Sequence, residues 1–339
     1  MLTSAPKPGF VSEKFSENIT IHKIGIRKKH LHFWRRSEVI EWLIRAGFYY
    51  RILLRKNDYD LAHAFFGFPT GWLCYRNAGK LPYIISLRGS DVPGQNARLQ
   101  FDYKILAPSF RAIWKKASAL VACSEGLKER ALLFMPSVSI DVIPNGVELD
   151  RFSPIETAEK PEVLRLLTVG RLSVTKRIEM LIDAVDILHR TACKVHLTVV
   201  GSGKMERQLR KIVDERELGD VIKFTGRKDS NKMPEVYRRN DIFISASMQE
   251  GMSNAMLEAM SSGLPIVTTR CEGLAELIDG NGLIVEQDNI EEIAKAVKRL
   301  ADNPELYKQM STAARKQAEK FDWAKAASSY IEQYRKIIT

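Results

Sequence analysis

The sequence predicts an α/β protein made of two halves, each built on a parallel sheet. Three observations support this. Short, apolar, often β-branched runs alternate with amphipathic stretches along nearly the whole chain. A polar, turn-rich segment interrupts this rhythm near the middle, and the rhythm then restarts. The chain has 339 residues, and domains typically hold about 100–200. Strands of this composition are covered by helices on both faces.

Nine runs are short and apolar enough to be strands. The stretches between them have a helical period near 3.6. In Ile178–Arg190, for example, five large apolar side chains fall on one face. The predicted strands are, in order, Asp60–Ala64, Tyr83–Leu87, Ala119–Ala122, Leu164–Val169, Val195–Val200, Ile222–Phe224, Asp241–Ser245, Pro265–Thr268 and Gly282–Val285.

Turn residues mark the division between the halves. Pro144, Asn145 and Gly146 lie close together, and residues 155–161 are polar. We therefore predict a first domain over 1–145, a linker over 146–160 and a second domain over 161–320. A terminal helix over 321–339 follows a break near Phe321–Trp323 and is expected to pack back on the first domain. Two such domains place a ligand in the cleft that the carboxyl ends of their strands face.

Composition excludes several classes of protein. An apolar fraction of 45% excludes disorder. No run of about 18 uncharged apolar residues is present to span a bilayer as a helix. The N-terminus lacks the basic start and apolar stretch of a secretory signal. Four scattered cysteines without a CxxC motif fit a reducing compartment. We expect a cytoplasmic protein, either free or peripheral at the cytoplasmic face of a membrane.

The positive charge is concentrated in the first half. Residues 1–150 hold 22 Lys and Arg against 13 Asp and Glu, whereas the remaining residues hold 30 against 28. Basic clusters attract anionic lipid headgroups, phosphorylated substrates or nucleic acid, although a basic surface can also be merely solvated. No nucleic-acid recognition motif accompanies this charge, so nucleic acid is not expected as a partner. The clusters are Arg27–Lys29, Arg35–Arg36, Arg55–Lys56 and Lys115–Lys116.

The densest chemical signal follows the strand that ends at Ser245. Glu250 precedes a predicted helix and Glu258 lies within it, eight positions later. The free N–H groups at a helix start favour a phosphate, which Gly251 lets approach the backbone closely. Ser253 or Asn254 can cap this helix. Glu258 alone would be a solvated helix charge, but the upstream Glu250–Gly251 favours a binding site. The residues expected to line it are Gly251, Met252, Ser253, Asn254 and Glu258.

A second signal follows the strand that ends at Val169. Gly170 ends the strand, and Arg171 and Lys176 bracket a short loop before the next helix. Two cations at the carboxyl edge of a parallel sheet suit a diphosphate. We expect no metal, because we identify no Asp-x-Asp run that would hold a divalent ion over a nucleotide. Gly201, in Gly-Ser-Gly after the following strand, is a weak signal, because an ordinary turn also uses this pattern.

Together these motifs resemble the nucleotide-binding half of group 1 (family 4) retaining glycosyltransferases of the GT-B fold, which has two Rossmann-like domains facing across a cleft. The similarity covers about 143–338. It rests on Gly170–Leu172 with Lys176, Gly201–Gly203, Phe224–Arg227 and Glu250–Gly251 followed by Glu258 and Gly263–Pro265. The first half resembles the family less closely, through His63–Pro69, Ser86–Val92, Ala122–Glu125 and Ile143–Val147.

The resemblance implies a role for each matching residue. Arg171 and Lys176 would hold the diphosphate of a nucleotide-sugar donor and stabilise the charge that develops on it. Glu258 would bind the ribose, and Glu250 would contact hydroxyls of the transferred sugar. Arg227 would mark the position of the base. Family members generally need no metal or cofactor.

The implied reaction moves a sugar from a nucleotide diphosphate to an acceptor hydroxyl with retention of configuration. The acceptor would be lipid-linked or a saccharide, in the synthesis of a cell-surface polysaccharide or glycolipid. Two alternatives stay open. One is a non-hydrolysing sugar-nucleotide epimerase on the same fold, and the other is a truncated, non-catalytic remnant that binds the donor.

Two features depart from the family pattern. Many relatives carry a histidine where this chain has Leu87–Asp91, and Arg88 occupies that segment here. Arg88 cannot act as a base at neutral pH but can bind an anionic group, with Asp91 as a polar contact or as a salt-bridge partner. The chain also begins where relatives have already completed a first strand, turn and helix. We therefore expect either that the start of the chain is placed too late or that the first domain lacks these elements.

Overall fold

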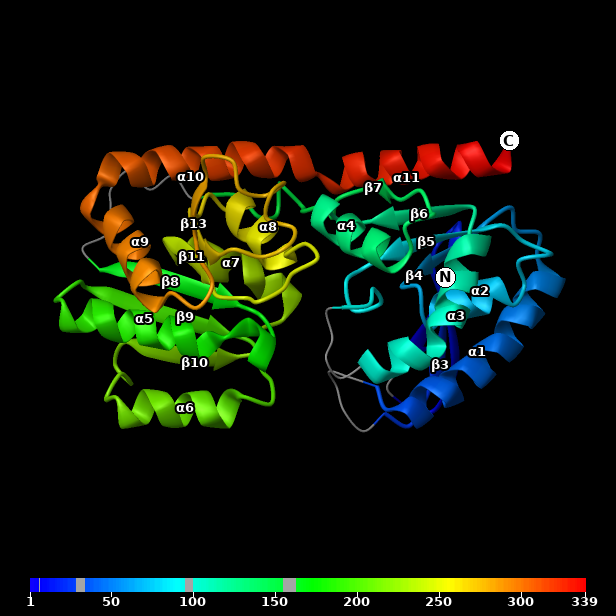
Figure 1. Ribbon diagram of the computed structural model, residues 1–339, viewed down its shortest axis with the longest axis horizontal. Coiled ribbons are helices and arrows are strands. Elements are labelled where there is room, and N and C mark those ends of the chain that lie inside the picture. Colours follow the sequence, from blue (N-terminus) through cyan, green and yellow to red (C-terminus); the bar gives the residue numbers. More distant parts are fainter. Residues whose placement is uncertain (6, 29–33, 95–99, 155–162) are drawn as a thin grey trace. The chain divides into compact units, whose positions relative to one another are not determined.

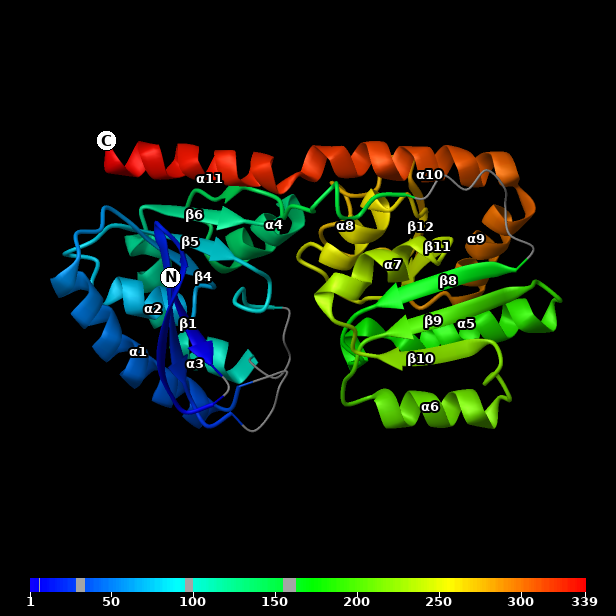
Figure 2. The ribbon, with the colours of Figure 1, turned by 180° about the vertical axis from the view of Figure 1, so that it is seen from behind.

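The computed structural model describes residues 1–5, 7–28, 34–94, 100–154 and 163–339. Within these ranges the chain forms two compact units. Unit 1 comprises Met1–Ala122, Arg130–Asp141 and Glu332–Thr339, and unit 2 comprises Cys123–Glu129 and Val142–Ile331. Figure 1 labels their helices and strands, and Figure 2 shows them from behind. No helix of the described residues is both long and apolar enough to cross a membrane.

Unit 1 contains two sheets. A four-stranded sheet has the order β4-β5-β6-β7, and a three-stranded sheet has the order β1-β3-β2. Helix α1 packs on β1, β3 and α2, and α2 packs on β4 and β5. The elements are β1 (Leu2–Ala5), β2 (Gly9–Ser16), β3 (Ile19–Gly25), α1 (Arg36–Lys56), β4 (Ala62–Phe65), α2 (Thr70–Tyr75), β5 (Tyr83–Leu87), α3 (Gln100–Lys116), β6 (Ala119–Ala122), α4 (Glu125–Phe134) and β7 (Asp141–Val142).

Unit 1 adds a mixed three-stranded sheet to the parallel sheets that the sequence predicts. Strand β1 pairs with β3 in parallel, but β2 pairs with β3 in antiparallel fashion. Only Glu17 and Asn18 separate β2 from β3, and a two-residue connection permits a hairpin but not a parallel crossover. Strand β2 is exposed along its whole length, and its sequence lacks the continuous apolar run on which the nine predicted strands are based.

Unit 2 is built on a six-stranded sheet with the order β10-β9-β8-β11-β12-β13. Every pairing in it is parallel. The strands are β8 (Leu164–Val169), β9 (Val195–Val200), β10 (Ile222–Gly226), β11 (Ile242–Ser245), β12 (Ile266–Thr269) and β13 (Gly282–Val285). The helices are α5 (Ile178–Arg190), α6 (Glu206–Glu215), α7 (Met233–Arg238), α8 (Asn254–Ser261), α9 (Ile290–Asp302), α10 (Pro304–Ala318) and α11 (Trp323–Ile338), of which α11 ends in unit 1.

The apolar faces of these helices form the core of unit 2. Helix α5 packs on α6, α9, β9 and β11, whereas α8 packs on α7, α10 and β12. Leu181, Ile182 and Val185 of α5 are completely buried, as the helical period predicts. Strand β12 starts at Ile266, one residue later than predicted, because Pro265 has no N–H to donate to the sheet.

The order of these strands creates a switch point. Strand β8 lies between β9 and β11. From β8 the chain continues to β9 and β10 on one side of it, and then crosses to β11 on the other side. At the amino end, Asp241 joins the two central strands by accepting hydrogen bonds from the backbone N–H and the guanidinium of Arg165 at 2.7–2.9 Å. The loops that follow β8 and β11 therefore leave the sheet next to each other at its carboxyl edge, where open α/β sheets bind ligands.

Candidate functional site

The loops that follow β8 and β11 meet at the switch point. The backbone N–H of Met248 donates to the carbonyl of Thr175 at 2.9 Å. Thr175 lies in the short 3-10 helix Val174–Lys176, and Met248 follows the end of β11. Strand order thus brings together the basic loop and the acidic loop that the sequence predicts as site segments.

Glycines let neighbouring loops of this edge touch. Gly201 has a φ of +139°, and a Cβ there would lie 1.8 Å from the carbonyl oxygen of Gly170. A Cβ on Gly203 would lie 2.1 Å from the carbonyl oxygen of Leu172. The Gly-Ser-Gly turn is therefore required for packing against the basic loop, and direct contact with a ligand need not explain it.

Lys176 and Glu250 form an ion pair through Nζ and Oε1. The Ser247 hydroxyl donates to the same carboxylate oxygen at 3.2 Å. Both charged side chains are largely buried, with 23% and 17% of their side-chain surface exposed. This burial lowers the pKa of Lys176 to about 8; nearby Cys271 opposes the shift and Arg171 adds to it.

A thiol shares this environment. Cys271 follows β12, and burial raises the pKa of its thiol to about 12, although Lys176 acts in the opposite direction. The thiol is therefore protonated at neutral pH and a poor nucleophile.

Hydrogen bonds from several side chains hold the start of α8. Ser253 is the N-cap, and its Oγ accepts the N–H of Met256 at 3.3 Å; of the two predicted caps, Ser253 is the correct one. Asn145 Nδ2 donates to Asn254 Oδ1 at 2.8 Å, and the Asn145 N–H points to the sulfur of Met252. The junction motif Ile143–Val147 thus braces the predicted phosphate-binding end of the helix.

Ser124 braces the loop just before α8. Its Oγ donates to the carbonyl of Gly251 at 2.6 Å and also caps α4 by accepting the N–H of Leu127 at 3.1 Å. Gly126, in the first turn of α4, packs against Glu272 and Gly273. The start of α4 is therefore part of unit 2 and supports the Glu250–Gly251 loop.

Glu258 lies one turn into α8 and pairs with Tyr237. The Tyr237 hydroxyl, on α7, donates to Glu258 Oε2 at 2.7 Å. Burial raises the pKa of Glu258, while this hydrogen bond and the nearby Arg151 act to lower it. Arg151 also donates to the Ser230 hydroxyl at 2.7 Å.

Two predicted cations stand at the rim of the same edge. Arg171 and Arg227 are exposed, and neither forms an ion pair with a described residue. Arg171 is close enough to Lys176 to lower its pKa. Arg227 follows Gly226, whose carbonyl accepts the N–H of Gly201 at 2.9 Å.

Arg88 and Asp91 belong to unit 1, after β5. Asp91 is buried and accepts the backbone N–H groups of Gly67 and Arg88 at 2.7 and 2.8 Å. Its carboxylate therefore joins two loops, and the Arg88 guanidinium lies 4.9 Å from the centre of the Phe65 ring. Burial and nearby Arg88 lower the pKa of His63 to about 4, so this imidazole is neutral at pH 7.

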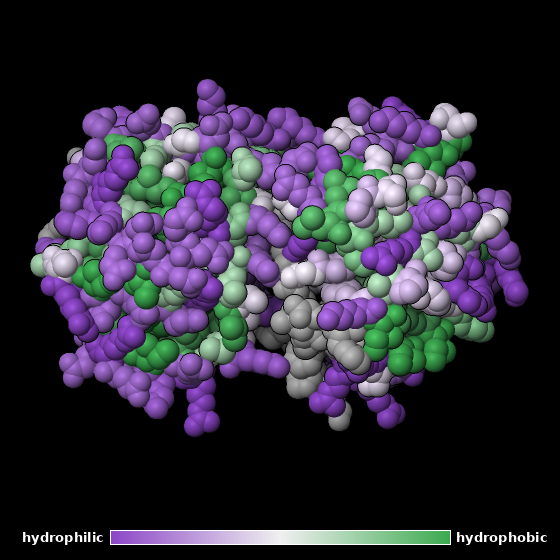
Figure 3. Space-filling model, in the orientation of Figure 1, coloured by the Kyte–Doolittle hydropathy of each residue, from purple (hydrophilic) through white to green (hydrophobic). Residues whose placement is uncertain are grey.

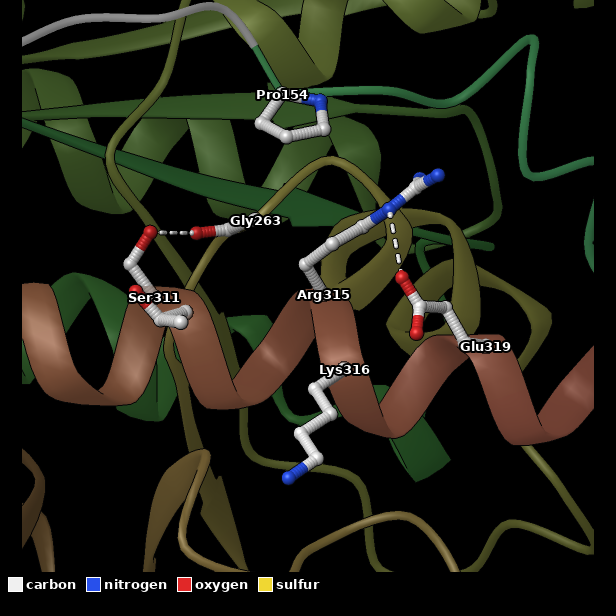
Figure 4. Close-up of a pocket in the computed structure, with 7 residues that line it drawn as sticks. Pro154, Gly263, Ser311, Arg315, Lys316 and Glu319 are labelled. Atoms are coloured by element: carbon white, nitrogen blue, oxygen red, sulfur yellow. Dashed lines mark hydrogen bonds and ion pairs between the residues drawn. The ribbon is translucent and has the colours of Figure 1, made fainter.

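Helix α10 packs on α8, and Figure 4 shows side chains of α10 near Pro154 and Gly263. The guanidinium of Arg315 donates to the carbonyls of Leu149, Phe152 and Ser261 at 2.8–3.0 Å. Ser311 donates to the carbonyl of Gly263 at 2.6 Å. The hollow drawn in Figure 4 lies between α10 and the segments that contain Pro154 and Gly263. Because these hydrogen bonds hold the segments in place, the residues that line the hollow have a structural role.

Sequence reasoning missed Tyr237, Asn145 as a partner of α8, and Ser124. Tyr237 lies in no segment that signals chemistry. Ser124 and Asn145 lie in the family-like segments Ala122–Glu125 and Ile143–Val147, but the sequence alone assigns them no contact. All three contacts join residues more than twenty positions apart. Among the described residues no group of three or more His, Cys, Asp and Glu is placed to hold a metal ion. Asp58 and Asp60 do form an Asp-x-Asp run, but they precede β4 and lie in unit 1.

Comparisons with known proteins identify the family of this chain. A family model described as "Glycosyl transferases group 1" matches residues 151–317, and one described as "Glycosyltransferase Family 4" matches residues 5–151. The chain belongs to the group 1 glycosyltransferases.

One relative of this glycosyltransferase is an uncharacterized glycosyltransferase of Methanocaldococcus jannaschii. It is 25% identical over 328 residues, which are 95% of this chain and 86% of the relative. Three further curated relatives are matched over 50–61% of their own length.

Solved structures share the fold. Sucrose-phosphate synthase from Thermosynechococcus elongatus superposes with a TM-score of 0.84 and 22% identity, covering 99% of this chain and 88% of that one. Anabaena HepE in complex with UDP-glucose superposes with a TM-score of 0.71 and 18% identity, covering 86% and 82%. The glycosyltransferase therefore has the GT-B fold that its sequence predicts.

Proposed function

We propose that this glycosyltransferase transfers a sugar from a nucleotide-diphosphate donor to an acceptor hydroxyl with retention of configuration and without a metal ion. The observation that carries the proposal is the meeting of Lys176, Glu250 and the start of α8 at the switch point of unit 2. A buried ammonium beside a helix N-terminus suits a diphosphate. The complex of Anabaena HepE with UDP-glucose supports a nucleotide-sugar donor.

Each group then has one task. Lys176 and the exposed Arg171 bind the diphosphate, and α8 directs its N–H groups at it. The Glu258 carboxylate, oriented by Tyr237, accepts hydrogen bonds from the ribose hydroxyls. When Lys176 turns to the diphosphate, Glu250 is released from the ion pair and accepts hydrogen bonds from hydroxyls of the sugar. Arg227 lies on the side where the base binds. The backbone of Gly170, of Gly201 and of residues Gly251 to Asn254 forms the wall of the donor site.

The chemical step breaks the bond between the anomeric carbon and the phosphate oxygen and forms a bond to the acceptor oxygen on the same face. The acceptor proton passes to the departing phosphate oxygen, so no side chain is needed as a base. Positive charge from Lys176 and Arg171 stabilises the negative charge that grows on the leaving diphosphate. This stabilisation replaces the divalent ion that other transferases use.

We infer that the acceptor is a saccharide or lipid-linked group handled at the cytoplasmic face of a membrane, in polysaccharide or glycolipid synthesis. Support comes from the basic first half of the chain. Arg88 and Asp91, at the carboxyl edge of the four-stranded sheet of unit 1, are the residues we assign to the acceptor side.

A thermal-shift screen tests the donor site. Wild-type protein is melted with UDP, GDP, ADP and their sugar conjugates, in EDTA, beside Lys176→Ala and Glu258→Ala. A true ligand at about 100 times its Kd stabilises by about 2.7 kcal/mol, and both variants should lose that gain. The control Lys308→Ala removes an exposed cation of α10 and should keep it.

The products of the reaction test the activity. NMR of the product formed with a competent acceptor should show the anomeric configuration of the donor. Release of nucleotide that depends on the acceptor supports transfer. An isomerised donor formed without acceptor would show an epimerase instead, and nucleotide binding without turnover on any acceptor would show a remnant.

A further inference from the structure

One side of helix α1 exposes a line of large apolar side chains. Ile40, Ile44 and Phe48 are 58%, 69% and 63% exposed. They are four residues apart, so they lie along the same side of the helix. The opposite side carries Trp42 and Ala46 into the core of unit 1. A continuous apolar stripe of this kind on a protein surface indicates an interaction site.

The apolar surface continues onto the neighbouring hairpin. Ile44 and Phe48 border a hollow of 460 Å³ whose other walls include Phe10 of β2 and Tyr49 of α1. The rings of Phe10 and Tyr49 are stacked with their centres 4.1 Å apart. Phe15, farther along β2, is 73% exposed. Figure 3 shows hydrophobic residues at the surface in the region of unit 1 where α1 and α3 lie in Figure 1.

Exposed cations continue the same line. Arg51 and Arg55 follow Phe48 by three and seven residues, which places them on the same side of α1. Both are exposed, and neither forms an ion pair with a described residue. The acidic residues of α1 do not balance them, because Glu41 pairs with Arg45 at 2.9 Å and Glu38 is buried at the helix start.

We propose that this α1 face, formed by Ile40, Ile44, Phe48, Arg51 and Arg55, docks unit 1 on an anionic lipid bilayer. The apolar side chains enter the boundary between headgroups and acyl chains, and the two guanidinium groups bind lipid phosphates. The net positive charge of the face complements such a surface, whereas a second copy of the chain would bring like charges together. Only the purpose of docking, which is to bring the site to a lipid-linked acceptor, rests on the proposed function.

Vesicle sedimentation without donor or acceptor tests the docking itself. Wild-type protein is mixed with vesicles of phosphatidylcholine alone and with vesicles containing about one third phosphatidylglycerol. Binding is expected on the anionic vesicles and should fall severalfold between about 0.1 and about 0.5 M sodium chloride. Equal binding to both vesicle types, or to neither, would overturn the proposal.

Two double variants separate the apolar and the charged parts. Ile44→Ala with Phe48→Ala should weaken partitioning into anionic vesicles by about tenfold or more. Arg51→Gln with Arg55→Gln should remove the preference for anionic lipid. Because all four side chains are exposed, the melting temperature should stay at the wild-type value.

Matched controls change the same chemistry elsewhere. Leu133→Ala with Ile331→Ala removes two exposed apolar side chains, and Arg207→Gln with Lys308→Gln removes two exposed cations. Both controls should bind vesicles like wild type. If the α1 variants change only the oligomeric state in size-exclusion chromatography, the face belongs to a second copy and the proposal fails. Retained vesicle binding with no nucleotide binding would contradict the proposed function alone.

Discussion

Glu258 of α8 accepts a hydrogen bond of 2.7 Å from the hydroxyl of Tyr237 on α7. Tyr237 is completely buried, so the bond fixes the carboxylate relative to the core of unit 2. Burial raises the pKa of Glu258, and the tyrosine hydroxyl opposes this by stabilising the charged form. The tyrosine thus keeps a half-buried carboxylate available as an acceptor.

Replacing that hydroxyl should make nucleotide binding more sensitive to acid. In Tyr237→Phe the pKa of Glu258 rises further, so protonation removes the acceptor at a higher pH. We expect the acid midpoint of affinity to move to higher pH, measured by calorimetry with the best-binding nucleotide between about pH 5 and about pH 8. The matched control is Tyr307→Phe, whose hydroxyl bonds the Asp241 carbonyl instead. An unchanged midpoint in Tyr237→Phe would contradict the role.

The Lys176–Glu250 pair predicts opposite effects on two ligands. In Glu250→Gln, Lys176 loses its carboxylate partner and the site loses a negative charge that repels the diphosphate. The free nucleotide diphosphate should therefore bind as well as or better than it does to wild type. The sugar conjugate should bind about tenfold less tightly, because a charged acceptor for its hydroxyls is gone. Calorimetry with both ligands measures the ratio, and an equal loss for both would show that Glu250 is structural.

The depressed pKa of Lys176 predicts how binding depends on pH. Only the ammonium form attracts a diphosphate, so affinity should fall as the pH rises through about 8. Lys176→Ala should bind about tenfold or more weakly at pH 7 and lose this dependence. Lys308→Ala should retain it.

The stability of the ligand-free protein should show the opposite trend. The pKa of Lys176 is lower in the folded chain than its ordinary value of 10.5, so the unfolded chain binds more protons between about pH 8 and that value. Stability from this group therefore rises with pH across the window. Chemical denaturation gives the free energy of unfolding of wild type and of Lys176→Ala at each pH. Plotted against pH, this free energy should have different slopes for the two proteins in this window, and identical slopes would contradict the lowered pKa.

Gly201 should tolerate no side chain. A Cβ would lie 1.8 Å from the Gly170 carbonyl oxygen in a backbone with a φ of +139°. Gly201→Ala should lower the free energy of unfolding by about 2 kcal/mol or more and abolish nucleotide binding. Gly219→Ala is the control, because a Cβ there meets no atom within 4 Å. Thermal melts of both variants make the comparison.

Ser124 should affect donor binding through the Gly251 carbonyl. Ser124→Ala should raise KM for the donor about threefold to tenfold and cost about 1 kcal/mol of stability from the lost cap on α4. Ser124→Gly removes the same bond to Gly251, but the weaker cap lowers the free energy of unfolding by only about 0.3 kcal/mol. If KM for the donor changes in parallel with the stability of the two variants, and so returns to the wild-type value in Ser124→Gly, the serine serves only as the cap of α4.

Much of the α/β pattern could be predicted because it is local. Strands β5, β6, β8, β9 and β13 have the predicted bounds, since each is a short apolar run between polar turns. The helical period likewise gives α5 its observed limits. The pattern failed for β1, β2 and β3, which lack such runs: β1 is half-buried, β2 is exposed, and only the last two residues of β3 are buried.

The sequence alone determined which loops carry charged groups and that these loops follow the carboxyl ends of strands, because composition and periodicity are properties of neighbouring residues. Only the tertiary structure decided which groups meet. Lys176 and Glu250 lie 74 positions apart and pair because β8 and β11 are adjacent in the sheet. No spacing in the chain encodes that adjacency, which arises from burying the helices of unit 2 around one sheet.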